Sequence, residues 1–276
     1  MDILEKIVAN KRIEVAHQKE AVPLDMLFRL GAQRLSRQPV SMRQALEQSV
    51  SGIIAEFKRR SPSKGWLSPH AKVEEVIPVY DHDGAAACSI LTDSRFFGGS
   101  FSDLQRARSL VQLPLLRKDF IIDAYQIYQS LVLGADAILL IAACLTEDAC
   151  NNLARTAHQL GLEVLLEVHA KEELTHHNEH IDMLGVNNRK LGTFHTDINN
   201  SFRMIQFIKS EVGTGIDAPL LISESGISEM KEMEDLRAVG FRGFLIGETL
   251  MKDGFHFSNY KLQRHPESDS EKNYES

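Results

Sequence analysis

The segment "GADAILLIAACLTEDACNNLARTAHQLGLEVLLEVH", residues 134–169, contains two short apolar runs that flank one longer polar segment. The runs AILLIAA (137–143) and EVLLEVH (163–169) have the length and aliphatic character of buried strands. The polar segment opens on a residue suited to an N-cap, Thr146, and ends at Gly161, as helices often do. A strand, a helix and a second strand in this order predict a βαβ unit of a parallel sheet.

The same alternation extends over most of the chain. Strands are predicted at residues 53–58, 87–93, 113–120, 137–143, 163–169, 183–189, 219–226 and 243–250. Segments of helical period lie between them, including "DAYQIYQSLVLG" and "SEMKEMEDLRAVG". Eight strand-helix units in about 200 residues fit a (β/α)8 barrel, whereas doubly wound sheets usually have fewer strands. We predict an α/β fold, a single (β/α)8 TIM barrel with an N-terminal helical extension.

The flanks of the barrel differ from it in pattern. Residues 1–47 have helical periodicity and are expected to pack on the barrel, which spans residues 48–255. One face of this extension carries Ile3, Leu4, Ile7 and Val8. Residues 256–276 lose the apolar pattern and are rich in Ser, Glu, Asp and Lys, so a polar, disordered tail is expected.

Composition restricts the class of protein and its partners. The chain has 276 residues, 43% of them hydrophobic, and a net charge of −7, so it can form a large core and has no general attraction for nucleic acid or anionic membranes. It shows neither a signal-peptide core nor the roughly 20 consecutive apolar residues of a membrane span. We expect a soluble, cytoplasmic protein that acts on a small molecule, either as a monomer or as a homodimer.

Neither a disulfide framework nor a metal site is predicted. The three cysteines, an odd number with no close pair, are Cys88, Cys144 and Cys150. Two short clusters contain possible metal ligands, "YDHDG" with Asp81, His82 and Asp83, and "HHNEH" with His176 and His180 one helical turn apart. Both fall on predicted helices or helix ends of the outer wall, where a solvated polar face is the better interpretation.

Polar residues interrupt the predicted strands repeatedly at their carboxyl ends. They are Glu56, Lys58, Lys118, Asp119, Glu167, Asn187, Asn188, Arg189, Glu224 and Ser225. In a TIM barrel these ends meet on the face that holds the active site. Each residue alone could be a salt-bridged strand end, but burying so many ions for stability is unfavourable. The set therefore predicts a charged active-site mouth.

Three turns rich in glycine and serine predict a phosphate site beside this mouth. They are "SPSKG" (61–65), "SESGIS" (223–228) and "IGET" (246–249). Backbone N–H groups of such turns bind anions, and the loops after strands 7 and 8 commonly hold phosphate in TIM barrels.

The ordered motifs resemble those of the indole-3-glycerol phosphate synthase family. They include "IIAEFKRRSPSKG", "SILTDSRFFGGSFSDL", "LPLLRKDFIIDAYQIYQS", "GADAILLIAA", "GLEVLLEVH", "LGVNNRKL", "LISESGI" and "FLIGETLM". They cover residues 50–251, and "ILEKIVANKR" is similar to the family's N-terminal helix. The resemblance implies a TIM barrel that needs no cofactor. The implied reaction, in tryptophan biosynthesis, closes the pyrrole ring of 1-(2-carboxyphenylamino)-1-deoxyribulose 5-phosphate and releases carbon dioxide and water.

The resemblance also implies catalytic roles. Lys118 would be the general acid at the substrate's ketone oxygen, and Glu167 would transfer protons in the later dehydration. Lys58 would lie near the carboxylate that is lost, with Glu56 in the surrounding polar network. Asn187 would orient the substrate's polar groups. A lysine among cations and apolar walls can have a lowered pKa, which would suit an acid working near neutral pH.

Further positions match substrate-binding residues of the family. Arg189 would orient the substrate's hydroxyls and carboxylate, Phe97 and Phe120 would flank the anthranilate ring, and Glu224 would contact the substrate. Phosphate would be held by Ser61, Ser225, Gly226, Gly247 and the backbone of Glu248.

The sequence departs from the family pattern at two places, and two other functions are also compatible with it. Lys190 stands where the family usually has an acidic residue, and "GFHFSNYKLQRH" replaces the usual amphipathic final helix. Strand alternation directs Lys190 away from the face of Arg189. The alternatives are a phosphate-binding lyase that forms a Schiff base on Lys118 and a ligand-binding barrel without catalysis.

Overall fold

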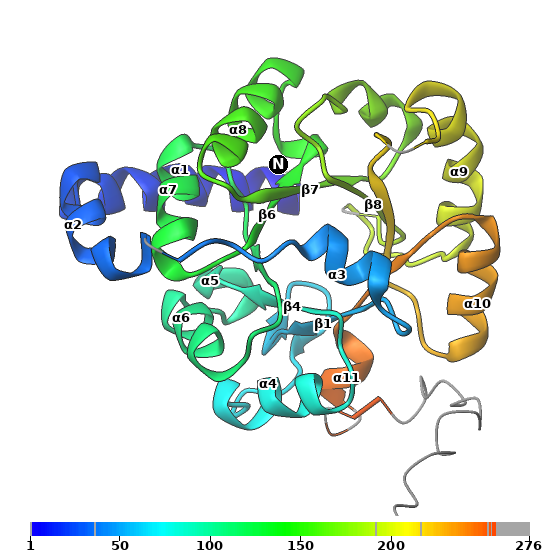
Figure 1. Cartoon of the computed structure of the whole chain (residues 1–276), viewed down its shortest axis with the longest axis horizontal. Coiled ribbons are helices and arrows are strands. Elements are labelled where there is room, and N and C mark those ends of the chain that lie inside the picture. The colour runs from blue at the N-terminus through cyan, green and yellow to red at the C-terminus, as the bar shows by residue number, and fades with distance from the viewer. Residues whose placement is uncertain are drawn as a thin grey trace, which may run out of the picture.

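Eight parallel strands close into a barrel at the centre of the molecule (Figure 1). The computed structural model describes residues 2–35, 37–190, 192–215, 217–252, 254 and 256–257. The strands neighbour one another in the order β1-β10-β9-β8-β7-β6-β5-β4 and confirm the predicted fold class. Their bounds are β1 Ile53–Phe57, β4 Ala87–Leu91, β5 Leu115–Lys118, β6 Ala137–Ile141, β7 Glu163–Val168, β8 Met183–Asn187, β9 Leu220–Glu224 and β10 Gly243–Ile246.

Helices cover the outside of the barrel. The longer ones are α4 Val73–His82, α6 Phe101–Leu110, α7 Ala124–Leu133, α8 Glu147–Gln159, α9 Asn199–Glu211 and α10 Met230–Val239. The shorter ones are α5 Ser94–Phe97, α11 Glu248–Lys252 and the 3₁₀ helices η1 Ala142–Cys144 and η2 Lys171–His176. A hairpin, β2 Arg60–Ser61 and β3 Gly65–Trp66, follows β1. Helix α8 begins as predicted, because the hydroxyl of Thr146 accepts a hydrogen bond from the Ala149 N–H at 3.2 Å.

All eight strands are shorter than the sequence pattern predicted, and two of them show the reason clearly. The predicted strand at 243–250 was wrong in its second half, since β10 ends at Ile246 and α11 begins at Glu248. The Met251 N–H bonds to the Gly247 carbonyl at 2.9 Å, so the apolar residues that continue the pattern belong to a helix. β8 likewise ends at Asn187, and Arg189 forms only an isolated bridge with Thr196. Periodicity alone cannot separate a buried strand from a short buried helix.

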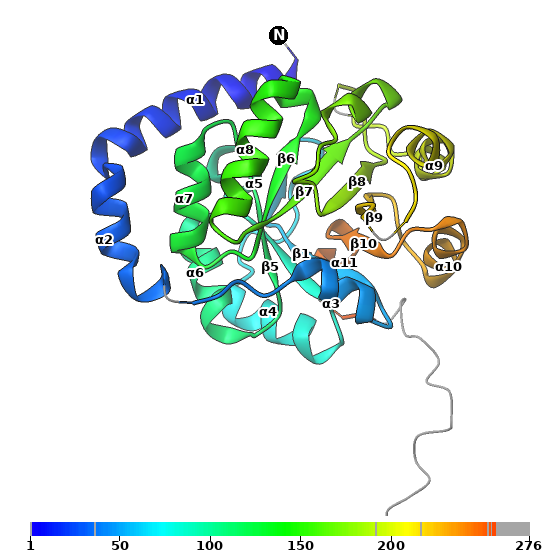
Figure 2. The same cartoon turned by 45° about the horizontal axis from the view of Figure 1, so that its top comes forward.

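The N-terminal segment covers both ends of the barrel. It forms α1 Ile3–Ala21, α2 Leu24–Leu35 and α3 Met42–Gln48. Figure 2 shows α1 and α3 at opposite ends, with α2 beside α7 between them. α1 covers the end where the strands finish, and α3 covers the end where they begin. The first 47 residues therefore complete the barrel core at two separate places.

Helix α3 plugs the amino end of the barrel. Met42 and Leu46 are at most 1% exposed and pack in one cluster with inward-facing strand residues such as Ile54 and Leu165. The carboxylate of Glu163, at the start of β7, accepts the N–H groups of Met42 at 2.7 Å and Arg43 at 2.9 Å. This contact satisfies backbone donors at the start of α3 and fixes the helix over the opening.

The C-terminal end contributes one more core residue. Phe257 is 3% exposed, and its ring centroid lies 6.0 Å from that of Tyr80. Residues 258–276, the rest of the predicted polar tail, lie outside the described residues. Among the helices that the structure describes, none is both long and apolar enough to cross a membrane.

We predict that Met42→Ala lowers the free energy of unfolding by roughly 2–4 kcal/mol, because a fully buried side chain at the barrel plug is truncated. The matched control is Met26→Ala on α2, where the methionine is 42% exposed and the expected loss is below about 0.5 kcal/mol. Urea unfolding of the two variants checks this. Equal midpoints would show that α3 does not stabilise the barrel.

Candidate active site

The barrel interior changes from apolar to charged toward the carboxyl ends of the strands. Side chains two residues apart on a strand share a face, and on four strands an inward apolar residue is followed by an inward charged one. The apolar members are Ile54, Leu116, Leu165 and Ile222, and the charged members are Glu56, Lys118, Glu167 and Glu224. All four charged residues line a cavity at the end covered by α1. The predicted charged mouth is therefore present.

Lys118 is the central charge of this cavity. Its Nζ lies 3.0 Å from Glu167 Oε2 and 3.3 Å from Glu224 Oε2, and its side chain is 13% exposed. A second lysine, Lys58, forms an ion pair with Glu56 next to it. The two lysines thus form ion pairs with three buried carboxylates that line this cavity.

The charges around Lys118 contradict the expectation of a lowered pKa. Burial alone lowers the pKa of Lys118, but Glu167, Glu224 and Glu56 outweigh this effect and raise the pKa above its ordinary value. The sequence interpretation placed other cations near this lysine, whereas its close neighbours are carboxylates. Lys118 is consequently protonated at neutral pH.

One of the three carboxylates is left without a cation of its own. Burial raises the pKa of Glu224 to about 8, and the charge of Glu167 adds to the rise while Lys118 opposes it. Burial also opposes ionisation of Glu167, but Lys118 and His169 lower the pKa of this carboxyl to about 2. Gly185 leaves space for Glu224, since a Cβ at that glycine would lie 2.2 Å from Glu224 Oε1.

An apolar slot forms the other side of the same cavity. The rings of Phe97 and Phe120 both line it, with their centroids 5.9 Å apart. Ile3, Leu4 and Ile7 of α1 also line it, which the sequence interpretation did not predict. Their shared helical face was visible in the sequence, but the end of the barrel that this face would cover was not.

A second cavity adjoins the first and holds most of the predicted phosphate residues. Ser225 and Gly226 have consecutive positive φ angles of 68° and 79°, which lie in the left-handed region that tight turns use. The lining of this cavity includes Ser225, Gly226, Gly247 and Glu248. Ser61 instead lines the first cavity, and Ser63 lines both.

Arg189 connects the walls of the second cavity. It donates to Glu248 Oε2 at 2.9 Å, Ser63 Oγ at 3.2 Å and Thr196 Oγ1 at 3.2 Å. Partial burial favours the neutral form of Glu248, but Lys252 and Arg189 lower the pKa of its carboxyl to about 2. The carboxylate of Glu248 is therefore bound by Arg189 and Lys252, which line the same cavity. Asn187 lines the first cavity beside Arg189, as predicted.

Two residues at the strand ends support this site from behind. His169, 12% exposed, places Nε2 3.5 Å from Glu167 Oε1 and Nδ1 3.6 Å from Glu173 Oε2. Asn188 donates from Nδ2 to Ser223 Oγ and to the Ser225 carbonyl, both at 3.0 Å, and so holds the turn that carries Ser225. The sequence interpretation included Asn188 among the strand-end residues but assigned no role to His169.

The remaining predictions lie outside the site. Lys190 is exposed and does not line either cavity. His176 ends η2, and His180 lies beyond that helix, so the predicted spacing of one helical turn was wrong. Within the described residues, no group of three or more His, Cys, Asp or Glu side chains could hold a metal ion.

Solved structures share this fold at low identity. N-acetylmannosamine-6-phosphate 2-epimerase from Clostridium perfringens superposes with a TM-score of 0.57 and 14% identity, over 79% of this chain and 94% of the other. The tryptophan synthase α-subunit of Pyrococcus furiosus gives 0.53 and 14%, over 74% and 91%. At this identity the similarity supports the barrel fold alone.

Sequence relatives are much closer. The family model for indole-3-glycerol phosphate synthase matches residues 4–256. Proteins with that name from Bacteroides thetaiotaomicron and Endomicrobium trichonymphae are 54% and 40% identical over 253 residues, which is 91% of this chain and 93% and 95% of theirs. The protein from Prochlorococcus marinus is 42% identical over 258 residues, 91% of this chain and 85% of its own. The chain belongs to the indole-3-glycerol phosphate synthase family.

Proposed function

We propose that the protein is an indole-3-glycerol phosphate synthase that converts 1-(2-carboxyphenylamino)-1-deoxyribulose 5-phosphate to indole-3-glycerol phosphate. The observation that carries the proposal is the order of three environments across two adjoining cavities. An apolar aromatic slot, a buried lysine among carboxylates and a glycine-rich turn follow one another. This order matches an anthranilate ring, a reacting ketone and a phosphate within one substrate. The expected cytoplasmic location and monomeric or homodimeric state stay predictions.

Ring closure needs a proton donor at the ketone oxygen. The ring carbon that bears the carboxylate attacks the ketone carbon, and the ketone oxygen takes a proton from Lys118. The protonated state of Lys118 suits this role, because its carboxylate neighbours favour a charged ammonium. Loss of carbon dioxide then returns the bonding electrons to the ring. In this step Lys58 holds the departing carboxylate, and Phe97 and Phe120 enclose the ring in an apolar slot.

Dehydration completes the indole. The hydroxyl formed at the former ketone leaves as water when it is protonated, and a base removes a proton from the adjacent carbon or nitrogen. Glu167, 3.0 Å from Lys118, is placed to transfer these protons. Asn187, Arg189 and Glu224 orient the substrate's polar groups, while Glu56 fixes Lys58.

The same charges disfavour a Schiff-base mechanism. A lysine nucleophile must lose its proton before it attacks a carbonyl. The ionised carboxylate of Glu167 lies 3.0 Å from Lys118 Nζ and keeps the lysine charged. The ring-closure chemistry uses this charge directly.

Lys118→Ala should lower turnover at least about a hundredfold, because the positioned acid is removed. Binding of a phosphate-bearing substrate analogue should survive, since the second cavity does not include Lys118. Steady-state kinetics by indole fluorescence checks the first effect and calorimetry the second. The control is Lys171→Ala, an outer-wall lysine with a 53% exposed side chain, which should retain parental turnover. Parental turnover of Lys118→Ala would remove this residue from the acid role.

Ser225→Gly should raise KM several-fold and change turnover little, because it removes a hydroxyl at the proposed phosphate site. Glycine readily adopts the φ of 68° found at Ser225, so the turn should keep its shape. Steady-state kinetics separates the two constants. An unchanged KM would place the phosphate elsewhere.

As pH rises, Glu224→Gln should become more stable relative to the parent protein, because the parent must ionise a buried carboxyl. The folded protein retains a proton on Glu224 up to about pH 8, while the unfolded chain releases it near pH 4.5. Stability from this group is therefore full below about pH 4.5 and is lost as the pH approaches 8. Between pH 5 and pH 8.5, we expect the free energy of unfolding of the variant to rise relative to that of the parent by on the order of 4 kcal/mol, measured by urea unfolding. A difference that is the same at both values would contradict a raised pKa.

A further inference from the structure

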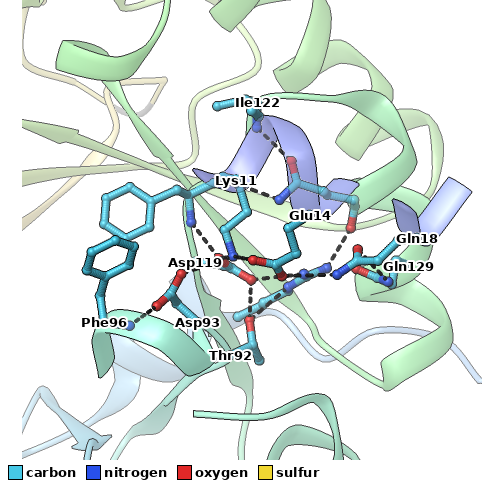
Figure 3. A network of polar contacts seen from close by, with 12 residues as sticks. Lys11, Glu14, Gln18, Thr92, Asp93, Phe96, Asp119, Ile122 and Gln129 are labelled. Carbon is cyan, nitrogen blue, oxygen red and sulfur yellow. Dashed lines mark hydrogen bonds and ion pairs between the residues drawn. The ribbon is translucent and has the colours of Figure 1, made fainter. Parts of the chain in front are cut away.

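Lys11 is a buried cation on the apolar face of α1. The buried residues of this helix are Leu4, Ile7, Val8, Lys11 and Val15, so the lysine occupies a core position. Its side chain is 1% exposed, and Nζ lies 2.9 Å from Asp119 Oδ1, 3.1 Å from Asp93 Oδ2 and 2.9 Å from Glu14 Oε2 (Figure 3). Buried ion networks often contribute no net stability relative to apolar packing. The Lys11 network is better explained by the cavity residues that it holds in position.

The Asp119 side of the network fixes the end of β5. Asp119 Oδ1 accepts the Phe120 N–H at 2.8 Å. Asp119 Oδ2 accepts the Thr92 hydroxyl at 2.6 Å and Arg117 Nη2 at 3.0 Å. These bonds hold the backbone between Lys118 and Phe120, which both line the cavity.

The Asp93 side fixes the helix that carries the opposite ring. Asp93 is the N-cap of α5, and its Oδ1 accepts the Phe96 N–H at 2.7 Å. Phe97 ends the same helix. The Lys11 ammonium therefore lies between the two carboxylates that anchor the segments of Phe97 and Phe120.

Lys11 also fixes the third wall of the slot. Ile7 lies one helical turn before it and lines the cavity together with Ile3 and Leu4. Ion pairs from one side chain of α1 to the ends of β4 and β5 prevent this helix from sliding over the opening. The ammonium group of Lys11 thus connects the three segments that form the apolar slot, those of Phe97, Phe120 and Ile7.

We propose that Lys11 is a positioning residue that sets the width of the apolar slot and so controls binding of the substrate's aromatic ring. The proposal rests on the proposed function and deepens it. Lys11 is not assigned to the chemical step, because it lines neither cavity. Its loss should weaken ring binding much more than phosphate binding.

The test compares Lys11→Met with Lys19→Met. Lys19 forms the next ion pair on α1, 2.6 Å from Asp123, but its side chain is 45% exposed and it lines neither cavity. Binding of anthranilate and of inorganic phosphate is measured separately and directly by calorimetry, without substrate. For Lys11→Met we expect a rise in KM, an anthranilate affinity at least about tenfold weaker and a phosphate affinity within about twofold. Lys19→Met should leave all three within about twofold.

The decisive quantity is the ratio of the two affinities. A folded Lys11→Met protein with the parental ratio, or with equal losses for both probes, would overturn the positioning role. If this variant does not fold, Asp93→Asn replaces it, since an asparagine keeps the capping oxygen and removes the charge that faces Lys11. A parental ratio in Asp93→Asn would then contradict the proposal. A parent protein that forms no indole product would defeat the proposed function separately, because the ratio is measured without turnover.

Discussion

The ion pairs of Lys118 are the constraint on which the site depends. A buried ammonium is stable only with close anionic partners, and here Glu167 and Glu224 come from other strands of the barrel. This requirement explains why charged residues follow apolar ones on the same strand faces, and why Gly185 stands beside Glu224. Burial raises the pKa of Glu224 to about 8, so this carboxyl is mostly neutral at pH 7 beside the charged Lys118. Before substrate binds, the site therefore contains a charged acid, Lys118, and a neutral carboxyl, Glu224.

The N-terminal segment is part of this arrangement. α3 closes the barrel below the charged layer, while α1 closes it above and supplies apolar side chains to the slot. The Lys11 network joins α1 to the strand ends that carry Lys118 and Phe120. The N-terminal segment therefore both closes the barrel and lines the site, although it lies outside the alternating pattern of strands and helices.

The barrel and the polar residues at its strand ends could be predicted from sequence because their signals are local. Alternation placed Glu56 and Lys58 on one face, and strand ends such as Glu167 fall where the pattern becomes polar. The pKa of Lys118 could not be predicted, since its neighbours depend on the arrangement of strands around the closed barrel. Lys11 was missed for a similar reason: a single charge in an apolar helical stripe does not reveal its partners. The end of β10 was misplaced because apolar residues continue into α11.

The most direct test is to incubate the purified protein with 1-(2-carboxyphenylamino)-1-deoxyribulose 5-phosphate and follow carbon dioxide and indole fluorescence together. The account predicts that both products appear in equal amounts and that borohydride traps no adduct on Lys118. Tight binding of the substrate without either product would contradict catalysis at this site. A trapped lysine adduct would contradict the protonated state of Lys118 on which the account depends.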